Sequence, residues 1–437
     1  MTSLIFPLSR IEGHARVVIE IDGEEILSAR FEAMEFRGFE QFLIGTPAEQ
    51  MPIVVPRVCG VCSTAHHVAA VKALEDAYGI TPPPLARKIR ELLLLGQLIQ
   101  NQATSIFLFT MPDRLGTESM FQEESGVNTK TTPIDIANQA LKVRKAGTDL
   151  ISLSGGQFIH PIKAVIGGVI SGIEPAEAEA TADQLQDVLS TACELFDIYW
   201  QKSLDMRDRI GTWGDDEPAF YISAVQSKCP NFDGDMIKIM SPEGKTKENF
   251  HPKDYRKHLH YHETDYSYAG QTSYQGQVIQ ANSLARINMT DRLGTRLADS
   301  YLSRFEKEFG KPAHGILLYD LARGIELVYG LERAIEILRE PLHLEDTDAP
   351  YKPRDGQGFG LVEAPRGPLI HHYSIQDGKI SRVKFIIPTV HNSLAIERAL
   401  ISAAERLITK DHISHELEKA VGRVVRAFDP CIACATH

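Results

Sequence analysis

The sequence predicts an α+β protein with a mainly helical bundle core and a small β region at its N-terminus. Residues 15–22 and 24–34 alternate apolar and polar side chains on either side of Asp22-Gly23, a pattern typical of a β-hairpin. Beyond residue 60, long segments carry apolar residues at helical spacing, and strand-like alternation is sparse. Long helices that follow a short β region favour an α+β fold built round a bundle.

Capping signals place the helices along the chain. Ser63-Thr64 can cap a helix that ends before Gly79, and three prolines at 82–84 precede a long periodic stretch, Leu85 to Phe109. Further helical patterns cover Pro133–Leu153, Pro175–Arg209, Thr290–Phe309, His314–Leu338 and Ser393–Leu407. Segments rich in Gly, Pro, Asp, Tyr and Lys are expected to be surface loops, namely Gly211–Tyr221, His251–Gln275 and Asp346–Gly360.

Composition and charge narrow the class of protein. Of the 437 residues, 43% are hydrophobic and 24% are charged, which is typical of a globular protein with a large buried core. A formal charge of −12 argues against a nucleic-acid partner, because no basic stripe is available to displace counterions. The first residues lack the features of a secretory signal, and no stretch reaches the roughly twenty apolar residues of a membrane helix. We therefore expect a cytoplasmic protein without a transmembrane segment.

The six cysteines are unevenly distributed. Two of them, Cys193 and Cys229, are isolated, and the other four form two CxxC motifs near opposite ends of the chain: Cys59, Cys62, Cys431 and Cys434. A secreted disulfide framework is normally denser, so metal or redox chemistry is favoured. If both pairs form one site, the termini converge on a buried metal site and residues 1–437 form one interlocked domain. Within it we expect a β-rich part, a helical core and a part that completes the site, at 1–55, 56–345 and 346–437.

The chemistry of the two pairs leaves several interpretations open. A CxxC in a loop that leads into a helix puts both sulfurs on one side, where backbone N–H groups favour the thiolate. A structural zinc half-site or a redox disulfide would use the same motif, although a zinc ribbon closes over a shorter span and a thioredoxin-like site needs a βαβ context. Four soft thiolates suit Ni, Fe or Zn alike. The residue types alone do not choose among these metals.

The motifs as a set resemble the large subunits of nickel–iron hydrogenases. RVCGVC followed by His66, and DPCIACATH at the end of the chain, match the two cysteine signatures of that family. Five further segments match in the same order, namely RIEGHA at 10–15, RGFE at 37–40, GGQFIHP at 155–161, EAPRG at 363–367 and IPTVHN at 387–392. The resemblance therefore spans the whole chain. It implies an enzyme that reversibly and heterolytically cleaves H2 to protons and electrons.

The resemblance also implies a metal centre and its ligands. Cys59 and Cys431 would bind nickel alone, whereas Cys62 and Cys434 would bridge nickel to an iron that keeps one CO and two cyanides. Arg366 matches the arginine whose guanidinium hangs above the open position between the metals and contacts one cyanide. Pro388 and Thr389 match the segment that binds the other cyanide, through a hydroxyl or a backbone N–H group at the position of Thr389.

Further residues match the family's proton path and a second metal site. Glu12 matches the carboxylate that relays protons to and from Cys431, and we expect it to be buried. His66 matches a histidine beside a bridging sulfur, whereas His67 has no such counterpart and is expected to be structural. A second site for Mg or Fe is implied at Glu40, the carbonyl of Phe385 and His437. Hard oxygens suit Mg there, and an imidazole suits Fe better.

Departures from the family pattern indicate the subtype and the partners. Asn101 and Gln102 stand where many members carry an aspartate flanked by histidines, and the chain is short. Both features resemble cytosolic multi-subunit hydrogenases linked to NAD(P), a deazaflavin or a heterodisulfide reductase. The resemblance implies a small subunit with a [4Fe–4S] cluster and further flavin or iron–sulfur subunits. The alternative is the related subunit of respiratory NADH dehydrogenases, which does no H2 chemistry and lacks the four cysteines.

Overall fold

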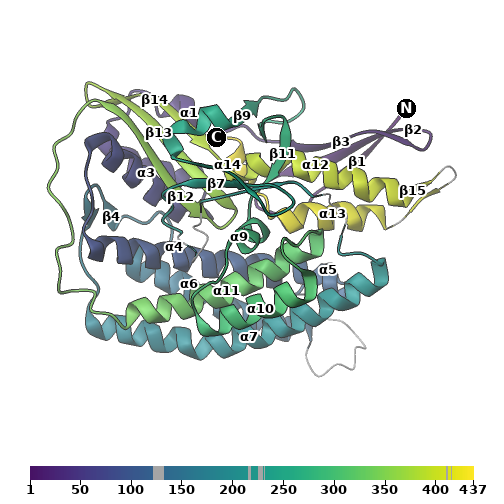
Figure 1. Ribbon diagram of the computed structural model, residues 1–437, viewed down its shortest axis with the longest axis horizontal. Coiled ribbons are helices and arrows are strands. Elements are labelled where there is room, and N and C mark those ends of the chain that lie inside the picture. Colours follow the sequence, from purple (N-terminus) through teal and green to yellow (C-terminus); the bar gives the residue numbers. More distant parts are fainter. Residues whose placement is uncertain (122–131, 215–217, 225–229, 231, 410–411, 415) are drawn as a thin grey trace.

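The computed structural model describes residues 1–121, 132–214, 218–224, 230, 232–409, 412–414 and 416–437. Its described part combines a layer of long helices with several small sheets, and this confirms the α+β class (Figure 1). The long helices lie in the lower half of the view, and the larger sheets lie above them with α1, α3, α12, α13 and α14. The long helices are α4 (Pro84–Thr104), α6 (Pro133–Gly155), α7 (Pro175–Ile210), α10 (Arg296–Phe309) and α11 (Ile316–Leu338).

The other helices range from four to twenty residues in length. Three of them border the cysteine motifs, namely α3 (Ser63–Tyr78), α12 (Pro388–Leu407) and α13 (Leu417–Phe428). The remainder are α1 (Phe39–Phe42), α2 (Met51–Val54), α5 (Met111–Leu115), α8 (Tyr255–His258), α9 (Ser283–Met289) and α14 (Ile432–Ala435). The helix expected between Ser63 and Gly79 is confirmed, and Gly79 ends it in the left-handed conformation with φ of 69°.

The strands form three sheets of three or more members. The expected N-terminal hairpin is confirmed, and a preceding strand extends it to a sheet of β1 (Thr2–Pro7), β2 (Ala15–Asp22) and β3 (Glu25–Ala33). A second antiparallel sheet holds β12 (Gly356–Ala364), β13 (Gly367–Gln376) and β14 (Lys379–Ile386). The third, in the order β8-β7-β6-β11-β10-β9, holds β6 (Phe220–Ser223), β7 (Ile237–Met240), β8 (Thr246–Phe250), β9 (Leu259–His262), β10 (Gln271–Tyr274) and β11 (Gln277–Gln280). Two-stranded ribbons pair β4 (Ala164–Val165) with β5 (Gly168–Val169) and β15 (Ile408–Thr409) with β16 (His412–Ile413).

The six-stranded sheet corrects one expectation from the sequence. The segment His251–Gln275, expected to be a surface loop, contains α8, β9 and β10. Its strands are four residues long, and three of the four residues of β9 are exposed. Such short strands carry too little alternation to be recognised. They pair with each other and with β11, and the parallel pairing of β11 with β6 joins them to the rest of the sheet.

The two ends of the chain meet inside the molecule. Glu12 and Cys431 form a parallel β-bridge, and the N–H of Ile432 donates to the carbonyl of Glu12 at 3.1 Å. The N–H of Arg37 donates to the carbonyl of Thr436 at 2.9 Å. One hydrophobic core contains buried residues from Ala15 through to Ala435. The C-terminus is therefore held by backbone bonds and not frayed.

One helical stretch in the described part of the chain, Pro84–Leu115, has the length and apolar character that a membrane crossing requires. Of its most apolar window, 83% is buried within the protein. The stretch packs against α6 and α11, so neighbouring helices cover its apolar side chains. Burial of this kind is typical of a core helix.

Two glycines let α4 and α6 approach closely. A Cβ atom added at Gly96 would lie 3.0 Å from the backbone nitrogen of Ile151. A Cβ atom added at Gly147 would lie 2.7 Å from the backbone nitrogen of Gln100 and 2.9 Å from the carbonyl of Gly96. Because these neighbours are backbone atoms, a side chain at either position must push the helices apart.

We predict that Gly147→Ala lowers the free energy of unfolding by about 2 kcal/mol, because overpacking outweighs the gain of about 1 kcal/mol in helix propensity. Asn138→Ala, at an exposed position of the same helix, is the control and should leave the stability unchanged or slightly higher. Denaturant titration of both variants measures the difference. A Gly147→Ala protein at least as stable as the wild type would refute the close helix contact.

Candidate metal centre

The first CxxC motif lies in a tight loop between two helical segments. Cys59 is extended after a 3-10 turn (Val55–Val58), and Cys62 caps the start of α3. The side chain of Gln97 in α4 holds the loop in place through two hydrogen bonds to backbone groups. Its oxygen accepts from the N–H of Ala65 at 2.9 Å, and its nitrogen donates to the carbonyl of Val61 at 3.0 Å. The N–H of Cys62 in turn donates to the Cys59 sulfur at 3.3 Å, so the loop itself supports a thiolate.

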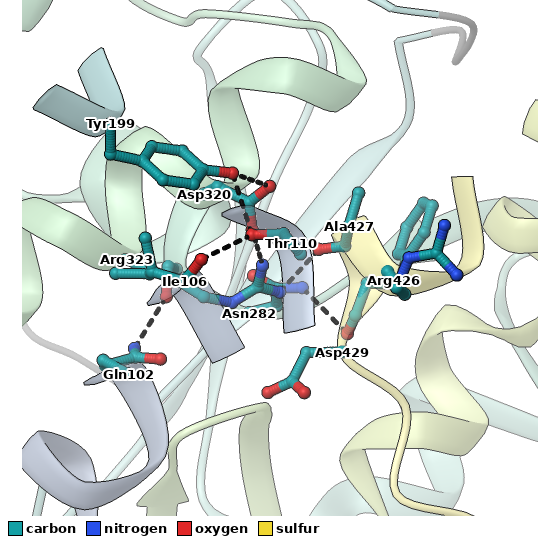
Figure 2. A network of polar contacts seen from close by, with 12 residues as sticks. Gln102, Ile106, Thr110, Tyr199, Asn282, Asp320, Arg323, Arg426, Ala427 and Asp429 are labelled. Carbon is teal, nitrogen blue, oxygen red and sulfur yellow. Dashed lines mark hydrogen bonds and ion pairs between the residues drawn. The ribbon is translucent and has the colours of Figure 1, made fainter. Parts of the chain in front are cut away.

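The second motif follows a helix end that buried side chains stabilise (Figure 2). Helix α13 ends at Asp429, which adopts the left-handed conformation with φ of 48°. The guanidinium of Arg323 donates to the carbonyl of Ala427 at 2.5 Å, and Asn282 donates to the carbonyl of Phe428 at 3.3 Å. These bonds satisfy carbonyls that every helix end leaves without partners, and the arginine charge complements the helix dipole. These bonds therefore hold the turn that leads into Cys431 in place.

A buried network of polar side chains holds Arg323 in position. Asp320 accepts from Arg323 at 2.6 Å and from the hydroxyl of Tyr199 at 2.8 Å. Thr110 lies 2.8 Å from the same hydroxyl. Figure 2 shows these groups arranged around the guanidinium of Arg323, between α11 and the end of α13. Because a buried arginine needs a paired carboxylate, Asp320 keeps Arg323 in place.

The four cysteine sulfurs form one cluster. Cys431 is at its centre, with its sulfur 3.2 Å from that of Cys59, 3.8 Å from that of Cys62 and 3.0 Å from that of Cys434. All four sulfurs lie within 4.8 Å of one another, and no more than 5% of any of these residues is exposed. All four are free cysteines. Sulfurs that share a metal at about 2.3 Å lie at comparable separations, so the donor set fits a thiophilic metal centre.

The electrostatics of the cluster favour a bound cation. Hydrogen bonds from Cys431 and Cys434 lower the pKa of the Cys62 thiol well below its usual value, whereas burial raises the pKa of Cys431 and of Cys434. One thiolate in the cluster is therefore stabilised by the remaining thiols. Ionising the others adds like charges in a buried space, which requires a metal cation to balance them.

Arg366, at the turn between β12 and β13, reaches the cluster from one side. Its guanidinium donates to the Cys62 sulfur at 3.2 Å and to the carboxylate of Asp429 at 3.2 Å, and it also contacts the backbone carbonyl of Asp429. Burial lowers the pKa of Arg366, but Asp429 and the cysteines outweigh burial and raise it above its usual value. Asp429 also accepts from Asn101 at 3.0 Å. Asn101 therefore supports the carboxylate that orients Arg366.

Thr389 and Pro388 lie at the start of α12 and border the same cavity as Arg366. Pro388 is the first residue of that helix, and the hydroxyl oxygen of Thr389 accepts from the N–H of Cys431 at 3.0 Å. This bond leaves the hydrogen of the Thr389 hydroxyl available to a ligand. A small cavity beside the sulfurs is lined by Cys62, His66, Ala364, Arg366, Leu369, Ile387, Pro388, Thr389, Cys431 and Cys434. Its walls combine apolar side chains with two hydrogen-bond donors, Arg366 and Thr389.

Glu12 contacts Cys431 and does not line the cavity beside Arg366. Its carboxylate oxygen is 3.1 Å from the Cys431 sulfur and accepts from the N–H of Ala433 at 3.1 Å. Contrary to the expectation from the sequence, Glu12 is half-buried and not fully enclosed. The flanking Gly13 and His14 are exposed, so this carboxylate lies between the cluster and the protein surface.

Glu40 and His437 come together as the sequence predicts, but a lysine joins them. The carboxylate of Glu40 lies 3.1 Å from Nε2 of His437 and 3.1 Å from the ammonium of Lys384. It also accepts from the N–H of Phe385 at 2.7 Å. Burial raises the pKa of Glu40, but His437 and Lys384 outweigh burial and lower it below its usual value. A carboxylate and an imidazole at this separation can share one octahedral ion at about 2.1 Å.

The two histidines after the first motif differ as expected. Nε2 of His66 lies 3.4 Å from the Cys434 sulfur, whereas Nδ1 of His67 lies 2.8 Å from the carbonyl oxygen of Pro52, away from the cluster. Since a carbonyl can only accept, His67 is the donor. Sequence reasoning missed Asp429 and Lys384. Asp429 precedes the second motif directly in DPC, and that proximity is the signal that could have identified it.

The remaining cysteines do not join the cluster. Cys193 is half-buried in α7, and burial raises the pKa of its thiol to about 11. Cys229 lies outside the described residues. Within the described ranges, the four-cysteine cluster is the one group of three or more Cys, His, Asp or Glu side chains placed to hold a metal.

Comparisons with known protein families and sequences agree with this geometry. The model of the nickel-dependent hydrogenase family matches residues 37–111 and 228–437, and a HoxL-like model matches residues 4–36. A vhu subunit of the F420-non-reducing hydrogenase of Methanococcus voltae is 34% identical over 418 residues, which cover 92% of this chain and 98% of that protein. The beta subunit of the NAD-reducing hydrogenase HoxS of Cupriavidus necator is 29% identical, and the match covers 99% of this chain and 94% of that protein.

Solved structures give the same result. An NAD+-reducing [NiFe]-hydrogenase in the H2-reduced state superimposes with a TM-score of 0.90 at 29% identity, covering 100% of both chains. A [NiFeSe] hydrogenase from Desulfovibrio vulgaris Hildenborough, at 22% identity and a TM-score of 0.82, shares the fold. Together with the paired cysteine motifs and their convergence on one buried cluster, these matches show that the chain belongs to the nickel-dependent hydrogenase family.

Proposed function

We propose that this chain is the catalytic large subunit of a nickel–iron hydrogenase, which reversibly cleaves H2 to protons and electrons. The observation that carries the proposal is the cluster of four buried, free cysteine sulfurs within 4.8 Å of one another. Two of them come from each end of the chain, in the order that the family motifs require. Such a cluster has no packing role that apolar side chains would not fill better.

The four sulfurs would hold nickel and iron with unequal roles. Cys59 and Cys431 would bind nickel alone, and Cys62 and Cys434 would bridge it to iron. One CO and two cyanides on that iron would occupy the cavity that Arg366 and Thr389 border. Its apolar walls suit diatomic ligands, and the two donors suit the cyanide nitrogens. When bound, this centre supplies the redox chemistry and keeps nickel as the metal that changes oxidation state.

The side chains around the cluster would handle the protons. Arg366 keeps a fixed positive charge beside Cys62, because Asp429 orients it through two contacts. Glu12 can accept a proton at its carboxylate oxygen from the Cys431 sulfur at 3.1 Å and pass it outward, since the carboxylate is half-buried. Glu40, His437 and the Phe385 carbonyl would hold a Mg or Fe ion, with Lys384 as a second partner of the Glu40 carboxylate.

The electrons would leave through a partner. Val61, inside the first motif, is 36% exposed although Cys59 and Cys62 are buried, so the cluster lies just below the surface. We propose that a small subunit with a [4Fe–4S] cluster docks on this face, with further flavin or iron–sulfur subunits beyond it. The Methanococcus voltae and Cupriavidus necator relatives are both hydrogenase subunits, which supports a multi-subunit assembly. The NAD-linked relative also supports a cytoplasmic location for the reaction.

Two other functions fit the observations less well. A subunit of the respiratory NADH dehydrogenase type would share the fold but would not need four converging cysteines. A structural zinc protein would use the cysteines but would leave Glu12, Arg366 and Thr389 without a role. Metal analysis of the purified complex separates these cases, because nickel with iron supports a hydrogenase and zinc alone supports a structural site.

We predict that Cys431→Ala abolishes nickel binding and the infrared bands of bound CO and cyanide. Cys431 contacts the three other sulfurs, and a missing ligand leaves an open site whose affinity is coupled to folding of both chain ends. Cys193→Ala is the matched control and should keep both signals. Nickel content is measured by elemental analysis. Full nickel content in Cys431→Ala would refute the ligand assignment.

Arg366→Lys is expected to keep nickel and iron but to lower H2 turnover by roughly 10²-fold or more. A lysine retains the charge, but it lacks the rigid plane that contacts Cys62, the carboxylate of Asp429 and the backbone carbonyl of Asp429 at once. The assay compares turnover per bound nickel with that of the wild type. If turnover per nickel is unchanged, Arg366 serves only to shape the loop.

Glu12→Gln should leave the metals and the infrared bands in place while H2 turnover falls steeply. Glutamine has nearly the same shape and can accept from the Ala433 N–H, but it cannot carry a proton. Exchange between H2 and D2O should fall with turnover, because exchange needs the proton path and no electron acceptor. Glu25→Gln, at an exposed position, serves as the control. Normal exchange with lost turnover would place the defect in electron transfer and would contradict the proton role.

A further inference from the structure

A row of hydrogen-bonded rings leads from the cysteine cluster into the interior. Nε2 of His66 lies 3.4 Å from the Cys434 sulfur, and Nδ1 of His66 lies 3.0 Å from Nε2 of His371. Nδ1 of His371 lies 2.7 Å from the hydroxyl of Tyr373. We call these three residues, His66, His371 and Tyr373, the ring chain. Each of its four ring nitrogens is used in one contact.

Three different elements hold the ring chain in place. His66 lies in the first turn of α3, and His371 and Tyr373 lie on the same face of β13. Phe385 lies in β14 and pairs with His371 of β13. Its ring packs against both imidazoles, with ring centroids 6.0 Å from His66 and 4.5 Å from His371. The three residues of the ring chain are at most 1% exposed. Their polar atoms therefore depend on one another for partners.

The ring chain has two possible hydrogen-bond patterns when both imidazoles are neutral, the form that their nearly complete burial favours. Each neutral imidazole has one N–H group and one lone pair. All the bonds must then run in the same direction, either from Tyr373 toward Cys434 or from Cys434 toward Tyr373.

A metal-bound thiolate selects one of these directions. The direction away from Cys434 needs an S–H donor, and a metal-bound sulfur has lost that hydrogen. In the other direction the Tyr373 hydroxyl donates to His371, His371 donates to His66, and Nε2–H of His66 donates to the sulfur. Each donated bond polarises the next ring, so that its own N–H becomes a stronger donor.

We propose that His371 and Tyr373 are positioning residues that orient and strengthen the hydrogen bond from His66 to the Cys434 sulfur. This inference rests on the proposed function, because it needs Cys434 to be a thiolate that bridges the metals. Hydrogen bonding withdraws electron density from a ligand sulfur and so tunes the metals that it binds. Both residues act on the centre through the ring of His66, without contacting it.

Tyr373→Phe tests the outer end of the ring chain. The variant keeps the ring but removes the donor to His371, so the His66 bond weakens and the sulfur donates more electron density to iron. The infrared band of the iron-bound CO should move to lower wavenumber, with unchanged nickel content. Tyr255→Phe is the matched control: the Tyr255 hydroxyl lies 3.4 Å from His372, the next residue on the opposite face of β13. Its CO band should stay in place.

Replacing His371 separates hydrogen bonding from packing. His371→Leu removes the donor to His66 completely, so the CO band should move further in the same direction than in Tyr373→Phe. In His371→Gln the side-chain amide can still donate to His66, and the band should lie near the wild-type position. The reduction potential of nickel should follow the same order, lowest in His371→Leu.

Specific results would overturn this inference. Equal bands in the wild type, Tyr373→Phe and His371→Leu would show that the ring chain does not act on the sulfur. Equal shifts in His371→Leu and His371→Gln, or in Tyr255→Phe and Tyr373→Phe, would show a packing effect. A wild-type complex without a CO band would overturn the proposed function, and with it this inference.

Discussion

The convergence of the two chain ends on one sulfur, Cys431, is the constraint on which the rest of the structure depends. Its sulfur contacts the three other cysteine sulfurs, and its backbone pairs with Glu12. The two cysteine motifs are 369 positions apart in sequence from Cys62 to Cys431, so the sulfur cluster forms only when the whole chain has folded. Binding of a metal at this cluster would therefore be coupled to folding of the termini.

The surroundings make the sulfurs chemically unequal. Arg366 donates to Cys62, His66 contacts Cys434, and Glu12 contacts Cys431. A guanidinium, an imidazole and a half-buried carboxylate thus each contact a different cysteine sulfur. This asymmetry follows from the fold, because the three groups come from the β12–β13 turn, from α3 and from the segment between β1 and β2. A symmetric four-cysteine zinc site has no need of such differences.

Buried charges keep this arrangement fixed. Arg366 pairs with Asp429, and Arg323 pairs with Asp320, in each case with both side chains at most 5% exposed. Such pairs contribute little net stability, since desolvation opposes their attraction. Removing one partner leaves an unpaired buried charge, however, and that cost holds the turn at Asp429 in a single conformation. The polar network is therefore better understood as a means of positioning Cys431 than as a source of stability.

The sequence by itself determined the long helices, the N-terminal hairpin and the four cysteines of the candidate metal centre. Periodicity and capping are local signals, and the cysteine motifs identify the donor atoms wherever the chain places them. The helix from Ser63 to Tyr78 and its end at Gly79 agree with the structure to the residue. The resemblance to a family implied that the two motifs form one site. The residue types alone did not decide which metal that site would bind.

Only the tertiary structure decided which groups surround the sulfurs. The short strands of the six-stranded sheet, the half-buried position of Glu12, the ion pair of Arg366 with Asp429 and the row from His66 to Tyr373 all depend on contacts between distant segments. No local pattern records such contacts, because burial and hydrogen-bond partners are properties of the packed chain. The sequence therefore specified the four cysteines, and the packing of the fold specified their environment.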